Sequence, residues 1–302
     1  MIWLVFIFIH VLLSVSPNGF DSIPMPVAVS DSIQVRTIDR AATPDGYYLY
    51  LPEATAQPRG VVLFVHGYGC LNPMIYGAWI RHLVGRGNVV IYPRYQESIW
   101  SPSPRMFAIN VSHAFSNATS LLDSIHYPYT LNNLAYVGHS YGGTTVAYLG
   151  VYYDSLAMPK PDVIMACQPG TGPFDALKLQ SYERMDSTIK LLVLVGKDDK
   201  TVGDALGKVI FSTAKVRNKQ FVEHLASKDE LFTASHYEPE GLDMAFDNGD
   251  RNVSAKRALR LAKLDAVDSL YWNLFDHTFQ NDTLCSGWEL DTARNHFPIE
   301  IK

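Results

Sequence analysis

The stretch Leu134-Ala-Tyr-Val-Gly-His-Ser-Tyr-Gly-Gly143 decides the fold. Its first half is a short apolar run with β-branched and aromatic members, which is typical of a strand buried on both faces. The residues from Gly138 to Gly142 follow at once and fit the pattern G-x-S-x-G, in which a serine sits on a strained turn between a strand and a helix. Glycines flank the serine because such a turn leaves no room for side chains. The stretch therefore predicts a strand, a sharp elbow at Ser140 and a helix.

The predicted elbow makes Ser140 a candidate nucleophile. A sharp reversal lifts its Oγ above the sheet, and the first N–H groups of the following helix face the same spot. Negative charge that develops on a substrate oxygen would be stabilised there. We expect two backbone N–H groups to form this oxyanion hole: that of Tyr141, directly after the serine, and that of Tyr68, in the loop after the apolar run 60–65.

The sequence on either side predicts an α/β fold. Apolar runs predict strands at 33–38, 47–51, 60–65, 88–92, 134–138, 162–168 and 190–196, and helical periodicity marks 73–84, 104–125 and 252–279. This alternation implies a mostly parallel sheet with helices on both faces. The turn signal at 43–46 makes the first two strands an antiparallel hairpin. The short stretch 169–189 leaves room only for a minimal cap.

Helix details follow from the same patterns. Asn72 is placed to cap the helix at 73–84. The buried stripe expected for the helix at 104–125 consists of Phe107, Val111, Ala114, Ala118, Leu121 and Ile125.

A reactive serine needs a base, and the base needs an acid that orients it. The apolar run 190–196 leads directly into two carboxylates, Asp198 and Asp199. We prefer Asp199, because it lies three residues after Gly196 and is followed shortly by Val202. This spacing is usual for the loop that carries the acid after a strand in α/β folds of this kind. Asp198 stays open as the alternative.

The base is sought among the histidines downstream of Ser140. His236 lies in a loop after an apolar stretch and just before Pro239, which makes it the candidate. The others have ordinary places: His224 in an alternating strand-like run, His277 on the last helix and His296 in the tail. Upstream, His66 is expected to hold its loop rather than to carry protons. Aromatic residues that either line an apolar cleft or belong to the core are Tyr68, Tyr76, Trp79, Tyr95, Trp100 and Tyr141.

Composition limits the possible classes of function. With 302 residues, 47% of them hydrophobic and 18% charged, residues 20–302 are expected to form a single globular domain. A net charge of −5 offers no basic surface for nucleic acid. The three cysteines, Cys70, Cys167 and Cys285, are too few for a disulfide scaffold and show no metal-ligand spacing, so buried free thiols with at most one bridge are expected, and the pairing stays open.

The amino terminus suggests export. Residues 1–13 are almost wholly apolar but too short to span a bilayer, so 1–19 are interpreted as a signal peptide of a secreted protein. The first basic residue is Arg36, so the basic start of a signal is missing and a membrane anchor stays open as the alternative. Asn-x-Ser/Thr triplets at Asn110, Asn117, Asn252 and Asn281 are expected glycan acceptors of an exported glycoprotein, the first two on the flank of the helix at 104–125.

Four segments, in this order, resemble the α/β-hydrolase superfamily: the His66-Gly67 loop, the elbow at 138–142, the Gly196-x-x-Asp199 loop and the Ala234-Ser235-His236-x-x-Pro239 segment. The small cap and the Ser-His-x-x-Pro segment resemble the branch that contains dienelactone hydrolases, chlorophyllases and cutinase-like polyester hydrolases. The resemblance implies a serine esterase or lipase that uses no metal or organic cofactor. A serine stands where dienelactone hydrolases have cysteine, and no cysteine pair lies beside His236, so neither that substrate nor plastic is implied.

The sequence thus predicts a carboxylic ester hydrolase with a Ser140, His236 and Asp199 triad, acting on a small-molecule or lipid-like ester, with no nucleic-acid or obligate protein partner. Two alternatives remain: acyl transfer or amide cleavage on the same triad, and a non-catalytic binding protein on a hydrolase scaffold.

Overall fold

The computed structural model describes residues 34–52, 60–100, 103–172, 175–227, 233–262, 264, 266–280, 284 and 299–301. The expected signal peptide at 1–19, together with Asn281, Cys285 and His296, lies outside the described residues, so export and the third cysteine stay predictions. Within the described ranges, no helix has the length and apolar character that a membrane crossing requires.

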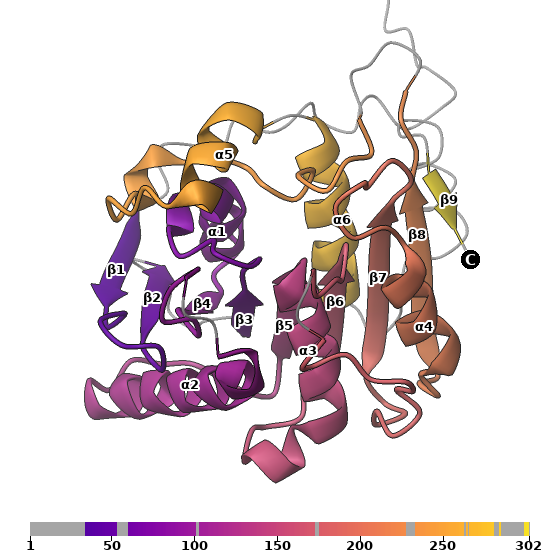
Figure 1. Cartoon of the computed structure of the whole chain (residues 1–302). Coiled ribbons are helices and arrows are strands. Elements are labelled where there is room, and N and C mark those ends of the chain that lie inside the picture. Colours follow the sequence, from indigo (N-terminus) through magenta and orange to yellow (C-terminus); the bar gives the residue numbers. More distant parts are fainter. Residues whose placement is uncertain are drawn as a thin grey trace, which may run out of the picture.

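A nine-stranded sheet in the order β1-β2-β4-β3-β5-β6-β7-β8-β9 runs through the described part of the molecule (Figure 1). Its strands are β1 (Val35–Asp39), β2 (Tyr47–Pro52), β3 (Val61–Val65), β4 (Val89–Pro93), β5 (Leu134–His139), β6 (Val163–Cys167), β7 (Lys190–Gly196), β8 (Asn218–His224) and β9 (Ile299–Ile301). The pairs β1–β2, β2–β4 and β8–β9 are antiparallel, and the strands from β4 to β8 pair in parallel. The predicted α/β class, with a mostly parallel sheet and an antiparallel opening, is confirmed.

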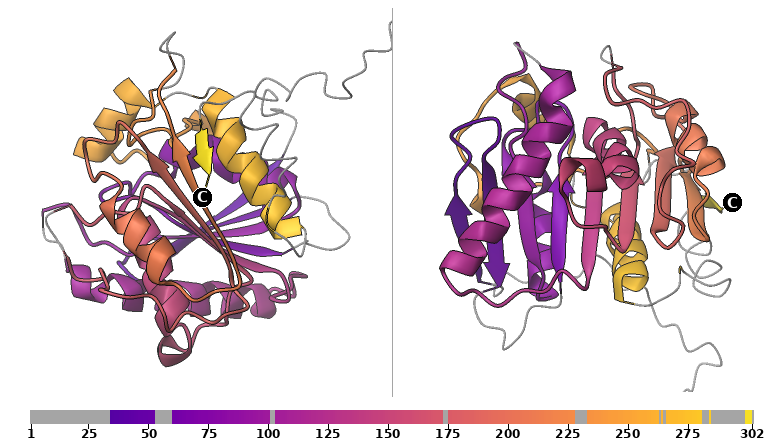
Figure 2. Two further views of the ribbon diagram at one scale, coloured as in Figure 1. Left: turned by 90° about the vertical axis from the view of Figure 1, so that its right-hand side faces the viewer. Right: turned by 90° about the horizontal axis from the view of Figure 1, so that it is seen from below.

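Helices cover both faces of the sheet (Figure 2). One face carries α1 (Gly77–Gly85) and α6 (Ala266–Gln280), and the other carries α2 (Phe107–Ser124), α3 (Tyr141–Tyr152) and α4 (Ala205–Thr213). The strands show why: in β3, Val62 and Phe64 pack on the α1 side while Val61 and Leu63 pack on the α2 side, and all four are fully buried. Each such side chain contributes about 1.5–3 kcal/mol by leaving water.

The helix predicted at 73–84 begins as a short 3₁₀ turn, η1 (Pro73–Tyr76), which continues into α1. Asn72 caps it as expected, since its Oδ1 accepts from the Met74 N–H at 3.1 Å. Its amide nitrogen donates to Asp247 Oδ1 at 2.7 Å. One side chain thus fixes both the start of the helix and a loop that lies far along the chain.

The single closing helix expected at 252–279 is wrong. The structure has two helices there, α5 (Val253–Leu261) and α6, because the backbone turns extended at Ala262 (ψ 134°). No proline or glycine occurs between residues 253 and 280, so the sequence offered no signal for the break. The break matters for function, because α6 covers the sheet while α5 borders the cavity described below.

The helix predicted at 104–125 is a 3₁₀ turn, η2 (Pro104–Met106), followed by α2. Its buried stripe was predicted correctly except at the end. Leu121 is only half-buried and Ile125 is 39% exposed, whereas Leu122 is buried. The reason is that α2 ends at Ser124, so Ile125 falls on the cap of the helix rather than on its inner face.

Two of the expected glycan acceptors already use their amide nitrogens. Asn110 is half-buried and its Nδ2 donates to the Tyr95 carbonyl at 3.0 Å. Asn252 caps α5, and its Nδ2 donates to the Gly69 carbonyl at 2.9 Å. Each of these contacts uses one of the two amide hydrogens, so glycosylation at Asn110 and Asn252 stays a prediction. Asn117 is exposed and stays a suitable acceptor.

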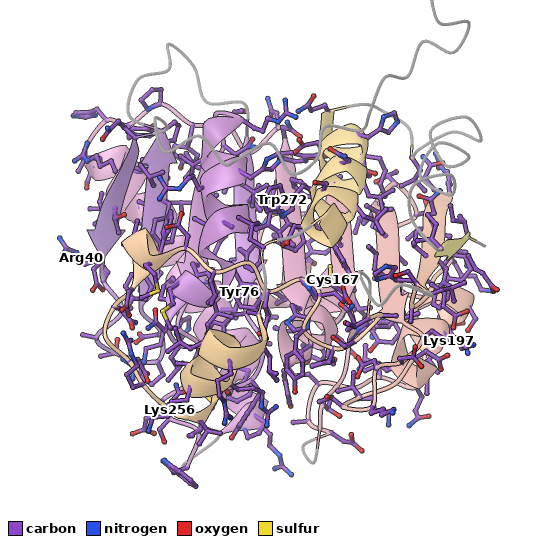
Figure 3. The ribbon with its side chains drawn as sticks, turned by 90° about the horizontal axis from the view of Figure 1, so that it is seen from above. Arg40, Tyr76, Cys167, Lys197, Lys256 and Trp272 are labelled. Atoms are coloured by element: carbon purple, nitrogen blue, oxygen red, sulfur yellow. The ribbon has the colours of Figure 1, made fainter. Side chains whose placement is uncertain are left out.

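The interior and the rim differ in chemistry. Figure 3 shows Tyr76 and Cys167 inside the molecule, with Arg40, Lys197 and Lys256 toward its edges. Cys70 and Cys167 are both buried free thiols, as expected, and burial raises the pKa of both.

Candidate active site

Ser140 occupies the elbow between β5 and α3 that the sequence predicts. Its backbone has φ 57° and ψ −120°, a conformation that costs a non-glycine residue about 1–3 kcal/mol. A hydrogen bond to a neighbouring strand holds the backbone in this strained conformation: the Ser140 N–H donates to the Cys167 carbonyl at 2.9 Å. Any Cβ on Gly138 would collide with the Gly142 carbonyl, and one on Gly142 would collide with the Val65 carbonyl. The strained turn therefore requires both glycines.

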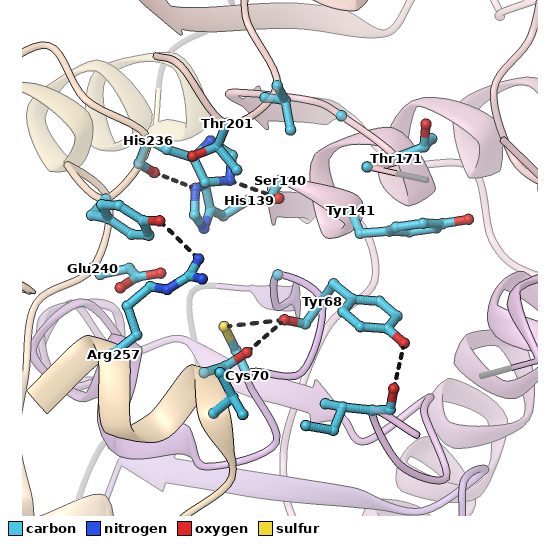
Figure 4. Close-up of a pocket in the computed structure, with 18 of the residues that line it drawn as sticks. Tyr68, Cys70, His139, Ser140, Tyr141, Thr171, Thr201, His236, Glu240 and Arg257 are labelled. Atoms are coloured by element: carbon cyan, nitrogen blue, oxygen red, sulfur yellow. Dashed lines mark hydrogen bonds between the residues drawn. The ribbon is translucent and has the colours of Figure 1, made fainter. Parts of the chain in front are cut away.

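The structure brings the three side chains chosen from the sequence into one hydrogen-bonded chain, of which Figure 4 shows His236 and Ser140. His236 Nε2 lies 2.9 Å from Ser140 Oγ, and His236 Nδ1 lies 2.6 Å from Asp199 Oδ2. A carboxylate oxygen only accepts, so Nδ1 carries the ring proton and the Nε2 lone pair faces the serine hydroxyl. This tautomer is the one that a base for Ser140 needs.

Asp199 follows β7 and is buried, whereas Asp198 is exposed. The second carboxylate oxygen of Asp199 accepts from the N–H groups of Thr201 at 2.8 Å and Val202 at 3.0 Å. Burial alone would raise the pKa of Asp199, but the hydrogen bond and charge of His236 and these two backbone donors outweigh it, so the pKa is lowered. The carboxylate stays ionised and can hold an imidazolium.

The loop after β3 is held rigidly beside the serine. Both ring nitrogens of His66 face carbonyl oxygens, that of Gly67 at 2.6 Å and that of Arg94 at 3.1 Å. Burial lowers the pKa of His66 to about 4, so the ring carries one proton at neutral pH. These contacts fit the expectation that His66 holds its loop. In the same loop, the ring of Tyr68 lies 6.2 Å from the ring of Tyr141, measured between ring centres.

A cavity of about 390 Å³ opens over Ser140. Tyr68 and Tyr141, whose N–H groups are the expected oxyanion donors, both line it, together with His139, His236 and Trp100. For the other aromatic residues a cleft and the core were both open, and the structure places Tyr76, Trp79 and Tyr95 in the core, where they are fully buried between the sheet and its helices.

Part of the cavity comes from residues that sequence reasoning missed. Val253, Ser254 and Arg257 of α5 line it, and so does Glu240 from the loop before η4 (Met244–Phe246). The remaining short helix, η3 (Asp154–Leu156), does not contribute. Nothing in the local pattern distinguishes Glu240 from Glu238, since both lie within four residues of His236.

A second missed feature is His139, directly before the nucleophile. It is buried, its Nε2 lies 2.8 Å from the His236 carbonyl oxygen, and its Nδ1 lies 2.7 Å from the Tyr76 hydroxyl. The only signal in the sequence is its place in the G-x-S-x-G elbow, which identifies the serine but gives no role to the residue before it.

No group of three or more His, Cys, Asp or Glu side chains suited to a metal ion occurs in the ranges that the structure describes. A scan against protein-family models gave no match for this chain, and a search of curated proteins gave none either.

Proposed function

We propose that the protein is a serine hydrolase that cleaves carboxylic esters on an α/β-hydrolase fold. One observation carries the proposal: the unbroken chain from Asp199 through His236 to Ser140, with donor and acceptor atoms 2.6 Å and 2.9 Å apart. Such a chain turns an unreactive hydroxyl into a nucleophile at neutral pH, because the proton has a base to go to.

The reaction follows from this geometry. Ser140 Oγ attacks the ester carbonyl carbon while His236 Nε2 takes the hydroxyl proton, and Asp199 stabilises the resulting imidazolium. Negative charge on the carbonyl oxygen is met by the N–H groups of Tyr68 and Tyr141, each worth about 3 kcal/mol in the transition state. His236 then protonates the leaving alcohol. A water molecule activated by the same imidazole releases the acyl group from Ser140.

Three features favour the α/β-hydrolase fold over other α/β arrangements. The serine sits on a sharp turn from β5 into α3, the candidate residues follow the chain order Ser, Asp, His, and the expected second oxyanion donor lies in the loop after β3. Esters are favoured as substrates because the cavity over Ser140 has aromatic walls, formed by Tyr68, Trp100 and Tyr141, that suit an apolar acyl group.

Labelling with a fluorophosphonate probe tests the proposal. The folded protein should form a covalent adduct on Ser140 and hydrolyse short p-nitrophenyl esters. Ser140→Ala should abolish both, whereas Ser155→Ala, which removes an exposed hydroxyl on η3, should leave both intact. Absence of an adduct on the folded wild-type protein would refute the proposal and favour a non-catalytic binding protein.

A further inference from the structure

Glu240 is an anomaly in the cavity wall. The residue is only 5% exposed, yet its carboxyl makes no hydrogen bond or ion pair with any residue that the structure describes. Its backbone is fixed, because the Glu240 N–H donates to the Tyr237 carbonyl at 3.0 Å. A polar group that the described residues leave without a partner must be satisfied from the cavity, by water or by a ligand.

Arg257 lies beside Glu240 on the same wall (Figure 4). It projects from α5, its guanidinium lies 5.7 Å from the centre of the Tyr237 ring, and its Nη1 donates to the Tyr237 hydroxyl at 2.8 Å. A guanidinium has five N–H donors, so donors remain for a ligand. The loop that carries His236 therefore also carries a buried acceptor with a cationic donor next to it.

The charges of this pair select the chemistry of the ligand. Burial raises the pKa of Glu240 to about 8 against the opposing effect of Arg257, so the carboxyl changes its protonation state close to neutral pH. An anionic ligand suits only the protonated carboxyl, and an ammonium group only the ionised one. A hydroxyl suits both, since it donates to a carboxylate or accepts from a carboxylic acid, and it also accepts from Arg257.

The position of the pair selects the part of the substrate. In ester cleavage the base returns its proton to the leaving alcohol, so the alcohol lies on the His236 side of the site. Glu240 and Tyr237 belong to the loop that carries His236. A hydroxyl held there therefore belongs to the alcohol part of the ester rather than to the acyl part.

We propose that Glu240 and Arg257 form a subsite for the free hydroxyl groups of the alcohol, so that the preferred substrates are esters of small polyols or sugars. This inference rests on the proposed esterase function and adds the substrate class. A cavity of about 390 Å³ accommodates a short acyl chain together with a small polyol.

Two esters with the same acyl group and a three-carbon alcohol test the subsite: glyceryl monobutyrate and propyl butyrate. We expect kcat/KM of the wild type to favour the glyceryl ester by about tenfold or more. Glu240→Leu should bring this ratio close to one. Glu240→Gln should retain most of it, because an amide still donates and accepts. The control Glu183→Leu removes an exposed carboxyl outside the cavity and should keep the wild-type ratio.

A wild-type ratio close to one, or an unchanged ratio in Glu240→Leu, would overturn the subsite. Failure of the esterase proposal has a different signature, which is no turnover of either ester. Saturation-transfer NMR on the Ser140→Ala protein then decides the subsite without catalysis: preferential binding of the glyceryl ester, lost in Ser140→Ala/Glu240→Leu, supports it, and equal binding of both esters overturns it. Thermal unfolding shows that each variant is folded.

Discussion

The imidazole of His139 donates from Nε2 to the backbone carbonyl of His236 across 2.8 Å. The direction is fixed because a carbonyl oxygen only accepts, so His139 Nδ1 is the acceptor for the Tyr76 hydroxyl at 2.7 Å. The Tyr76 oxygen in turn accepts from the Gly67 N–H at 3.1 Å. Burial, reinforced by the charge of His236, lowers the pKa of His139 well below its usual value, which keeps the ring neutral. Three buried hydrogen bonds thus connect the loop of Tyr68 to the loop of the proposed base.

Tyr76→Phe should impair both stability and turnover. It leaves His139 Nδ1 and the Gly67 N–H without partners, at about 1–3 kcal/mol for each buried group. Because the affected loop carries Tyr68, we expect kcat to fall while KM changes little. Urea unfolding and steady-state kinetics measure the two effects.

Tyr136→Phe is the matched control for that variant. Tyr136 is equally buried and donates to the Pro159 carbonyl at 2.6 Å, but it does not line the cavity. It should lose stability without a loss of kcat. If kcat falls no further in Tyr76→Phe than in Tyr136→Phe, the network stabilises the fold but does not position the site.

Exchange of the two neighbouring carboxylates for amides separates the triad acid from its alternative. Asp199→Asn should lower kcat by roughly 10⁴-fold, because the amide no longer fixes the tautomer with Nδ1 protonated. Asp198→Asn should keep near wild-type kcat and stability, since Asp198 is exposed and surface changes usually stay within about 0.5 kcal/mol. Ester hydrolysis by both variants at one pH is sufficient. A larger loss in Asp198→Asn would reverse the assignment.

The elbow and its partners were predictable because each has a local signal. The glycines at 138 and 142 mark a turn that excludes side chains, and the apolar run of β7 ends directly before Asp198 and Asp199. Parallel strands place their carboxyl ends at one edge of the sheet. Side chains that follow β5 and β7 therefore lie close together although many residues separate them.

The remaining wall of the cavity had no such signal. The turn between α5 and α6 occurs without proline or glycine, so periodicity alone merged the two helices. Which of the two glutamates after His236 faces the cavity depends on how their loop packs against α1 and α5, and that packing is tertiary. Tertiary packing also decides the positions of the two tryptophans: Trp100 is 83% exposed at the cavity, whereas Trp79 lies in the core.

Ser140→Gly should stabilise the protein relative to Ser140→Ala while both are inactive. At φ 57° an alanine keeps the strain of the serine, whereas glycine adopts this conformation freely. Relief of about 1–3 kcal/mol exceeds the entropy cost of about 0.5–1 kcal/mol for glycine, so a net gain on the order of 1 kcal/mol is expected. Thermal unfolding of the two variants measures it. An equal midpoint for both would mean that the elbow stores no strain.

The buried carboxyl of Glu240 should make stability depend on pH. Its pKa is raised from 4.5 to about 8 by burial, so from about pH 4.5 to pH 8 the folded protein keeps a proton that the unfolded chain has lost. Stability contributed by this group is therefore present below pH 4.5 and is lost as the pH rises through that window. Asp199 has a lowered pKa, so its contribution is lost only on acidification, as the pH falls through its folded pKa, and does not oppose the trend above pH 5.

Glu240→Gln removes this titration. The free energy of unfolding of Glu240→Gln relative to that of the wild type should therefore rise by up to about a few kcal/mol between about pH 5 and pH 8. Urea unfolding of both proteins at the two pH values measures the change. Glu183→Gln, which alters an exposed carboxyl, should follow the wild type at both pH values. Parallel pH curves for Glu240→Gln and the wild type would mean that the carboxyl ionises normally, and hence that water or another group already satisfies it in the cavity.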